Sequence, residues 1–343
     1  MIRDSHGHDN HSIEGIDGDT DIINLLKVIK VQPDEEIHFA KGQRILDEYH
    51  ACMDLDERTV LLLDGATGTE LDRRGVDVGL PLWSARAMIE APGVLEEVHR
   101  AYLEAGADAI ITNTFRTHER SLAKTGMGDR AGELTRDAVA IAQAARDAVN
   151  PEALVLGSVA PLEDCYSPEL APDAATCRLE HGRLIGQLVD AGVDLVLVET
   201  MSSAHEALAA AEAAAEQSPG NWAISFCLAA GKPGVLMDGT PLADVIGQFG
   251  GARFIGINCV AATVMDEQVR HLRTLLGDAR VIAAYGNVGY ADDENGWINT
   301  DAIDPAVYAS HAQSWIEAGA GIVGGCCGTT PGTILAIRES LGR

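Results

Sequence analysis

The chain is constrained most by a regular alternation of apolar runs and helical stretches that begins near residue 59. Runs rich in Val, Ile and Leu recur at 59–64, 108–114, 153–160, 194–200, 222–228, 253–259, 280–286 and 321–327. None alternates polar with apolar residues, which is typical of strands buried on both faces of a parallel sheet. Amphipathic helical stretches lie between them, at 92–107, 175–193, 204–217, 262–277 and 305–320. This order predicts an α/β fold, the (β/α)₈ or TIM barrel.

Glycine positions support the same architecture. Gly106, Gly192 and Gly319 each follow a helical stretch and precede an apolar run, as helix C-caps do. A doubly wound open sheet is the alternative, but it would carry a glycine-rich nucleotide-binding loop after an early strand. The segment GATG at 65–68 is too short for that loop.

Composition excludes several classes of partner. The chain has 343 residues, with 25 Lys and Arg against 52 Asp and Glu, for a formal charge of −27. Nucleic acids and anionic membranes both favour a basic surface, so neither is expected as the main partner. No apolar run approaches the roughly 20 residues of a membrane span, and the first residues lack the pattern of a signal peptide. We expect a soluble, cytoplasmic protein, monomeric or a small homo-oligomer.

The chain divides into two parts of unequal size. Residues 1–58 are predicted to form an acidic N-terminal extension whose first ~20 residues are flexible. Residues 59–343 are predicted to form the barrel. The seven cysteines are an odd number in a chain without a secretion signal, so buried thiols or a metal site are favoured over a disulfide framework.

Polar and metal-binding residues collect where the predicted strands end. In a barrel of this kind the active site is built at the carboxyl ends of the strands. Cys259 ends the sixth apolar run, and Cys326 and Cys327 end the eighth, between glycines that allow a sharp turn. Three thiolates suit a zinc ion with one open coordination position. Three buried structural cysteines are the alternative that spacing alone leaves open.

Five motifs in this order resemble the homocysteine S-methyltransferases. They are DGATGTEL (64–71), NTF (113–115), VET (198–200), GINC (256–259) and GGCCGTTP (324–331). The chain is similar to the members of that family that consist of the barrel only, over residues 59–343. The resemblance implies a Zn²⁺ ion held by Cys259, Cys326 and Cys327, with the thiol of homocysteine in the fourth position. Metal binding would deprotonate that thiol and make it a nucleophile for a methyl group.

The resemblance also implies how the amino-acid end of homocysteine is held. Glu199, assisted by Asp64, would bind the ammonium group, and the backbone N–H groups of the turn at Gly65, Ala66 and Thr67 would bind the carboxylate. We expect Asn258 to help order the zinc site.

The methyl donor is expected to be a small cation. The resemblance implies S-methylmethionine, S-adenosylmethionine or a betaine. Family members that use a folate donor through cobalamin carry large extra domains that do not fit within 343 residues, and betaine-type members usually carry an added C-terminal segment, so S-methylmethionine is favoured, with S-adenosylmethionine second. Trp83 is the best candidate for an aromatic contact with that cation, ahead of Phe115 and Tyr166, for which packing is the favoured role. The alternatives are a thiolate protein that binds zinc or senses oxidants without catalysis, and a methyltransferase for another small thiol or selenol such as selenocysteine.

Overall fold

The computed structural model describes residues 60–292 and 296–343, and its centre is a parallel sheet of eight strands. The strands are β1 (Leu61–Leu62), β2 (Ala109–Ile111), β3 (Leu154–Val159), β4 (Leu195–Met201), β5 (Trp222–Phe226), β6 (Phe254–Ala261), β7 (Val281–Asn287) and β10 (Ile322–Gly325). They pair in the order β1-β10-β7-β6-β5-β4-β3-β2. A parallel bridge between Leu63 and Ala109 joins the two ends of the sheet. The predicted (β/α)₈ barrel is confirmed.

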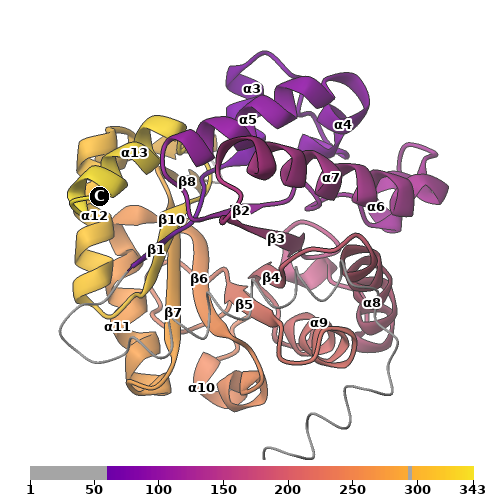
Figure 1. The fold of residues 1–343 in the computed structure, drawn as a ribbon. Helices are drawn as coiled ribbons and strands as arrows, with labels where there is room; N and C mark the ends of the chain where they lie inside the picture. The colour runs from indigo at the N-terminus through magenta and orange to yellow at the C-terminus, as the bar shows by residue number, and fades with distance from the viewer. Residues whose placement is uncertain (1–59, 293–295) are drawn as a thin grey trace, which may run out of the picture.

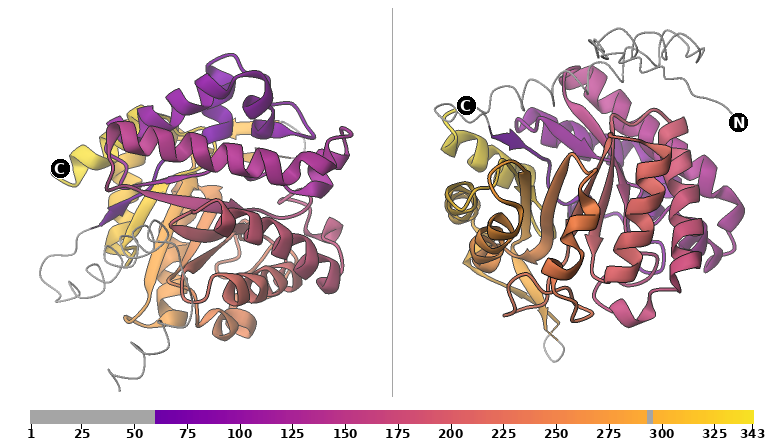
Figure 2. Two further views of the ribbon diagram at one scale, coloured as in Figure 1. Left: turned by 45° about the vertical axis from the view of Figure 1, so that its right-hand side comes forward. Right: turned by 90° about the horizontal axis from the view of Figure 1, so that it is seen from below.

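Helices surround the strands (Figure 1). They are α3 (Thr67–Arg73), α4 (Ala87–Glu90), α5 (Pro92–Glu104), α6 (Glu119–Ala123), α7 (Ala131–Val149), α8 (Ala174–Asp190), α9 (Ala204–Gln217), α10 (Leu242–Val245), α11 (Met265–Leu276), α12 (Pro305–Glu317) and α13 (Pro331–Ser340). The views in Figure 2 show the same outer ring of helices. None of the described helices has the length and apolar character needed to cross a membrane.

Two apolar layers explain why the strand sequences are continuously hydrophobic. On β4, Leu195 and Leu197 belong to the cluster inside the barrel, whereas Val196 and Val198 belong to the cluster between the strands and the helices. Both faces of the strand are therefore buried, and no polar face is needed.

The predicted helix C-caps are confirmed. Gly106, Gly192 and Gly319 all have positive φ, at 102°, 78° and 111°. After α5 the Gly106 N–H bonds to the Leu103 carbonyl at 2.9 Å and the Ala107 N–H to the Tyr102 carbonyl at 3.1 Å, which is a Schellman motif. The chain thus turns sharply out of each helix and into the next strand.

Two features differ from the sequence-based expectation. The helix α7 was not singled out by its pattern, and an antiparallel hairpin of β8 (Gly289–Asp292) and β9 (Gly296–Asn299) follows β7. The hairpin is short and two of its large apolar residues, Tyr290 and Trp297, are exposed, so no buried period marks it. The predicted extension, residues 1–58, lies outside the described residues and stays a prediction.

Candidate active site and metal centre

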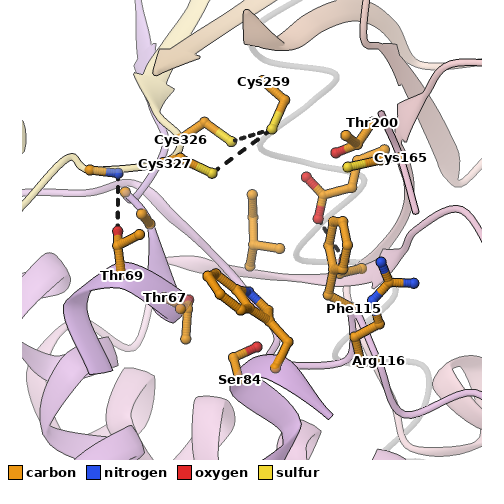
Figure 3. Close-up of a pocket in the computed structure, with 18 of the residues that line it drawn as sticks. Thr67, Thr69, Ser84, Phe115, Arg116, Cys165, Thr200, Cys259, Cys326 and Cys327 are labelled. Atoms are coloured by element: carbon orange, nitrogen blue, oxygen red, sulfur yellow. Dashed lines mark hydrogen bonds between the residues drawn. The ribbon is translucent and has the colours of Figure 1, made fainter. Parts of the chain in front are cut away.

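A cavity of 490 Å³ opens at the carboxyl ends of the strands. Eight of the ten predicted site residues line it: Gly65, Ala66, Thr67, Trp83, Glu199, Cys259, Cys326 and Cys327. Asp64 and Asn258 are fully buried behind its wall. Figure 3 shows the three cysteines converging at one side of this cavity.

The three cysteine sulfurs lie within 4.8 Å of one another. Cys259 Sγ is 3.4 Å from Cys326 Sγ and 4.0 Å from Cys327 Sγ. Two sulfurs about 2.3 Å from one tetrahedral ion would be about 3.8 Å apart. The spacing therefore fits a shared metal ion, and no fourth protein ligand joins this group among the described residues.

Unusual backbone geometry aims the sulfurs at one point. Cys259 has a φ of 59°, and the pairing of β6 with β7 shifts register between Asn258 and Ala261. Such a bulge turns a side chain away from the regular alternation of the strand. At the end of β10, a Cβ on Gly325 would lie 2.3 Å from Thr329 Oγ1, so only glycine fits there.

The cluster shares its protons unequally. Hydrogen bonds from Cys326 and Cys327 hold the pKa of Cys259 well below the usual thiol range. The same bonds, with burial, raise the pKa of Cys326 well above that range. The shared hydrogen bonds thus favour one thiolate within this group of three cysteines.

Asn287, at the end of β7, ties two of the cysteines together. Its side-chain N–H donates to the Cys259 carbonyl at 2.8 Å, and its Oδ1 accepts from the Cys327 N–H at 3.0 Å. Sequence reasoning missed this residue because the seventh apolar run was ended at residue 286. Its position directly after that run was the signal that could have identified it.

The side chain of Asn258, which was expected to help order the zinc site, bonds to Thr200 and Ser225. Its Oδ1 accepts from the Thr200 N–H at 3.0 Å and from Ser225 Oγ at 2.8 Å, and its Nδ2 donates to Thr200 Oγ1 at 2.7 Å. These bonds hold Thr200, whose φ is 60°, at the register shift of β4. Asn258 thereby fixes the residue that follows Glu199.

Glu199 is a buried carboxylate whose two oxygens are both oriented. Ser158 Oγ donates to Oε1 at 2.5 Å and the Tyr285 hydroxyl to Oε2 at 3.4 Å. Burial raises the pKa of Glu199 to about 7, although the Ser158 hydrogen bond opposes the shift. Burial thus disfavours the charged form of Glu199, and a cation in the cavity would favour it.

Asp64 lies close to Glu199 but is oriented by the backbone. Its Oδ2 accepts from the Ile111 N–H at 2.9 Å, and its Oδ1 has no hydrogen-bond partner among the described residues. Burial raises the pKa of Asp64 well above the usual range, and the charge of Glu199 adds to the rise. Two neighbouring buried acids are destabilised unless a proton or a cation compensates them.

The turn before α3 is joined to the cysteine turn by Thr329. Thr329 Oγ1 accepts from the Ala66 N–H at 3.1 Å and donates to the Cys326 carbonyl at 2.8 Å. The Ala66 amide is therefore already occupied, while Gly65 and Thr67 line the cavity beside it. Sequence reasoning assigned no such role to Thr329.

Aromatic residues form much of the remaining wall. Trp83, with a φ of 50°, packs so closely on α3 that a Cβ on Gly68 would lie 2.5 Å from its indole nitrogen. Phe115, Tyr166 and Trp297 also line the cavity, the last from the hairpin. The Tyr166 hydroxyl is 3.4 Å from Cys259 Sγ, so this residue contacts the cysteine cluster directly.

Comparisons with known proteins agree with this geometry. A family model described as "Homocysteine S-methyltransferase" matches residues 61–341. The homocysteine S-methyltransferase of Escherichia coli is 33% identical over 304 residues, covering 83% of this chain and 96% of that protein. A selenocysteine methyltransferase of Astragalus bisulcatus is 30% identical over 317 residues, covering 82% and 92%.

A solved structure agrees as well. The metallated form of the homocysteine methyltransferase MmuM from Escherichia coli superposes with a TM-score of 0.73 at 30% identity, covering 87% of this chain and 99% of that one. The resemblance first seen in five short motifs thus extends over the whole barrel. This chain belongs to the homocysteine S-methyltransferase family.

Proposed function

We propose that the chain catalyses zinc-dependent methyl transfer from S-methylmethionine to the thiol of homocysteine, giving methionine. The observation that carries the proposal is the group of Cys259, Cys326 and Cys327 in the same cavity as the buried Glu199. A metal-thiolate group beside an acid suits a substrate that has both a thiol and an ammonium group. The names of the relatives in Escherichia coli support the same acceptor.

The donor atoms favour zinc. Thiolates are soft ligands, and three of them with an open position fit zinc in a catalytic site. When bound, zinc would supply the positive charge that lowers the pKa of a substrate thiol. Around that site Asn287 fixes the backbone of Cys259 and Cys327, and Tyr166 contacts the Cys259 sulfur.

The two buried acids supply the site for the homocysteine ammonium group. Glu199 has both oxygens oriented by Ser158 and Tyr285, and Asp64 adds negative charge beside it. An ammonium group there would offset the repulsion between the carboxylates. The N–H groups for the substrate carboxylate would then come from Gly65 and Thr67, since Thr329 accepts the Ala66 N–H.

The chemical step breaks the bond between the methyl carbon and the sulfonium sulfur of the donor. The acceptor sulfur, having lost its proton, supplies the electron pair of the new carbon–sulfur bond, and the donor sulfur keeps the pair of the old one. S-methylmethionine therefore leaves as neutral methionine. The Trp83 indole can stabilise the sulfonium by about 0.5–2 kcal/mol, and S-adenosylmethionine remains the second donor candidate.

A selenol acceptor is the second candidate function. The similarity to the selenocysteine methyltransferase of Astragalus bisulcatus favours testing it. A selenol is more acidic than a thiol and would need less help from the metal. Relative rates with homocysteine and selenocysteine decide between these acceptors.

The assay should follow labelled acceptor, because S-methylmethionine itself yields methionine. Zinc-loaded protein is incubated with ¹³C-labelled homocysteine and, in separate reactions, S-methylmethionine, S-adenosylmethionine or glycine betaine. We expect ¹³C-methionine by mass spectrometry, fastest with S-methylmethionine. A protein that holds zinc but gives no labelled methionine with any donor would be a metal-binding protein without this activity, contrary to the proposal.

Cys326→Ser tests the metal centre. Loss of one sulfur should remove both zinc retention and labelled methionine, because the remaining two thiolates bind the ion poorly. Cys177→Ser is the matched control, since Cys177 is a buried cysteine on α8 that donates to the Pro172 carbonyl. Unchanged turnover in the Cys326 variant would refute a metal mechanism.

A further inference from the structure

The cavity contains one buried cation that the proposed chemistry does not use. Arg116 is only 9% exposed and, among the described residues that line the cavity, it is the sole arginine or lysine. Its guanidinium carbon lies 5.3 Å from the centre of the Phe115 ring, which also lines the cavity. Figure 3 shows the two side chains together on the wall. Arg116 is unusual in this position, since buried charged side chains are rare unless an opposite charge or hydrogen bonds compensate them.

No carboxylate neutralises Arg116 within the described residues. One terminal nitrogen, Nη1, donates to the carbonyls of Pro161 at 3.2 Å and Glu163 at 2.8 Å. The other N–H groups have no acceptor among the described residues, and the side chain lies on the cavity wall. By contrast, Arg120 nearby binds the carboxylates of Glu163 and Glu180.

The hydrogen bonds from Arg116 to the two carbonyls do not explain why a positively charged side chain is needed at this position. They hold the loop between β3 and α8, and a neutral donor could make them equally well. A guanidinium keeps further N–H groups in a planar fork that matches a carboxylate. A buried guanidinium with that fork unfilled is a site for a carboxylate that enters the cavity.

We propose that Arg116 binds the carboxylate of the methyl donor and so restricts donors to sulfonium compounds that carry a carboxylate. The inference rests on the proposed methyltransferase function. The proposed function assigns the carboxylate of homocysteine to the turn before α3, close to Asp64 and Glu199. Asp164 follows Glu163, whose carbonyl Arg116 binds. It is exposed and also lines the cavity, so it provides an acid for the donor's ammonium group.

The experiment removes the carboxylate charge of the donor and, separately, the guanidinium charge of Arg116. Rates are compared for S-methylmethionine and its methyl ester, using ¹³C-homocysteine and the wild type, Arg116→Met, Arg116→Lys and Arg120→Met. We expect the wild type to prefer the acid over the ester by roughly 10- to 100-fold in kcat/KM. Arg116→Met should lose most of that preference, and Arg116→Lys should keep part of it.

The Arg120→Met control separates charge recognition from support of the loop. Arg120 holds Glu163 but does not line the cavity, so its loss should leave the acid-to-ester ratio unchanged. An equal loss of rate with both donors in Arg116→Met would show a structural role only and overturn the proposal. A wild type that makes methionine equally fast from acid and ester would also overturn it, while leaving the methyltransferase function intact.

A second experiment determines whether Arg116 binds the carboxylate of the methyl donor or that of homocysteine. The acceptor 3-mercaptopropylamine lacks the carboxylate of homocysteine, and its rate relative to homocysteine should fall equally in wild type and Arg116→Met. A change of that ratio in the variant would assign Arg116 to the acceptor instead.

A binding measurement tests the proposal without catalysis. The affinity for S-methylmethionine alone, measured by tryptophan fluorescence, should be lower in Arg116→Met than in the wild type. An unchanged affinity would contradict the proposal.

Discussion

At the scale of single residues, the barrel imposes conformations and charges that these side chains would not adopt alone. Thr200 and Cys259 are not glycines, yet both have a φ near 60° (60° and 59°). Left-handed backbone of this kind costs of order 1 kcal/mol or more and persists only where the surroundings enforce it. The bonds from Asn258 and Asn287 supply that enforcement. Strain at these two positions directs Glu199 and Cys259 at the cavity.

Replacing Glu199 should weaken homocysteine binding. Glu199→Gln removes the charge that faces the substrate ammonium while keeping the bond from Ser158. We expect kcat/KM for homocysteine to fall by about 100-fold, mostly because KM rises. Because the pKa of Glu199 is about 7, wild-type affinity should also decline below that pH. The variant should lose this pH dependence, and a variant that keeps it would contradict the assignment.

His99 on α5 should make the fold sensitive to acid. It is fully buried, and neither ring nitrogen has a partner among the described residues. Burial lowers the pKa of His99 from 6.5 to about 4. The unfolded chain therefore binds a proton first, and stability falls as the pH drops from 6.5 toward 4, by about 3 kcal/mol in all.

The measurement is urea unfolding of wild type and His99→Leu at pH 7.5 and pH 4.5. Carboxylates elsewhere also titrate in this range, so the difference between the two proteins isolates the histidine. The free energy of unfolding should fall less with acid in the leucine variant. Equal losses in both proteins would refute the prediction.

At the scale of elements, the active site is made where regular strands stop being regular. β4 and β6 both shift register at their carboxyl ends, and β10 turns out of the sheet at Gly325. β7 stays in register and ends on Asn287, which binds backbone groups of Cys259 and Cys327. One regular strand thus serves as the fixed support for the cysteines of its two neighbours.

Asn287→Ala should loosen the metal centre without unfolding the barrel. Residues that orient metal ligands typically contribute 10- to 100-fold to affinity, and we expect a weakening of zinc binding of about that size. Competition with a chelator measures it. Asn221→Ala is the control, because Asn221 is also buried and bonds a backbone carbonyl, that of Asp194, at the start of β5. Equal zinc affinity in wild type and the Asn287 variant would contradict this role.

At the scale of the whole molecule, the chain carries a formal charge of −27, and its cavity should accept a cation. S-methylmethionine has a net charge of +1, and a negative field raises the local concentration of cations. Salt screens such fields over about 10 Å at 0.1 M. The acidity therefore favours the donor over neutral competitors.

Raising the salt concentration from 20 to 500 mM should lower kcat/KM for S-methylmethionine roughly two- to fivefold. Homocysteine is a zwitterion without net charge, so its kcat/KM at saturating donor serves as the internal control and should change little. A donor rate that does not respond to salt would exclude electrostatic steering.

Much of the candidate site could be predicted because its signals are local in sequence. The apolar run Ile322–Gly325 indicates a buried strand, and the cysteine pair directly after it, Cys326 and Cys327, indicates a metal site at the end of that strand. Parallel strands in a barrel bring their carboxyl ends together, so residues such as Glu199 and Cys259 were expected to meet before any distance was known. The cysteine cluster and the buried acid were reached in this way.

The positions that could not be predicted depend on which chain segments fold back over the strand ends. Trp297 reaches the cavity because a hairpin follows β7, and Tyr166 reaches Cys259 because the loop after β3 is held by Arg116. Neither loop has a period that marks its path. Asp64 lies behind the cavity wall, where its carboxylate accepts the Ile111 N–H across the barrel closure, and this position could not be predicted either.

Burial on both strand faces requires continuous apolar runs, so the barrel, its strand ends and the residue types at those ends could be predicted from the amino-acid sequence. Which polar groups are oriented, and which lack a partner among the described residues, depends on the folded molecule. A hydrogen bond depends on distances of a few tenths of an ångström between residues far apart in the chain. For that reason the three thiols could be predicted, whereas only the folded molecule shows that Arg116 bonds to two carbonyls and, among the described residues, to no carboxylate.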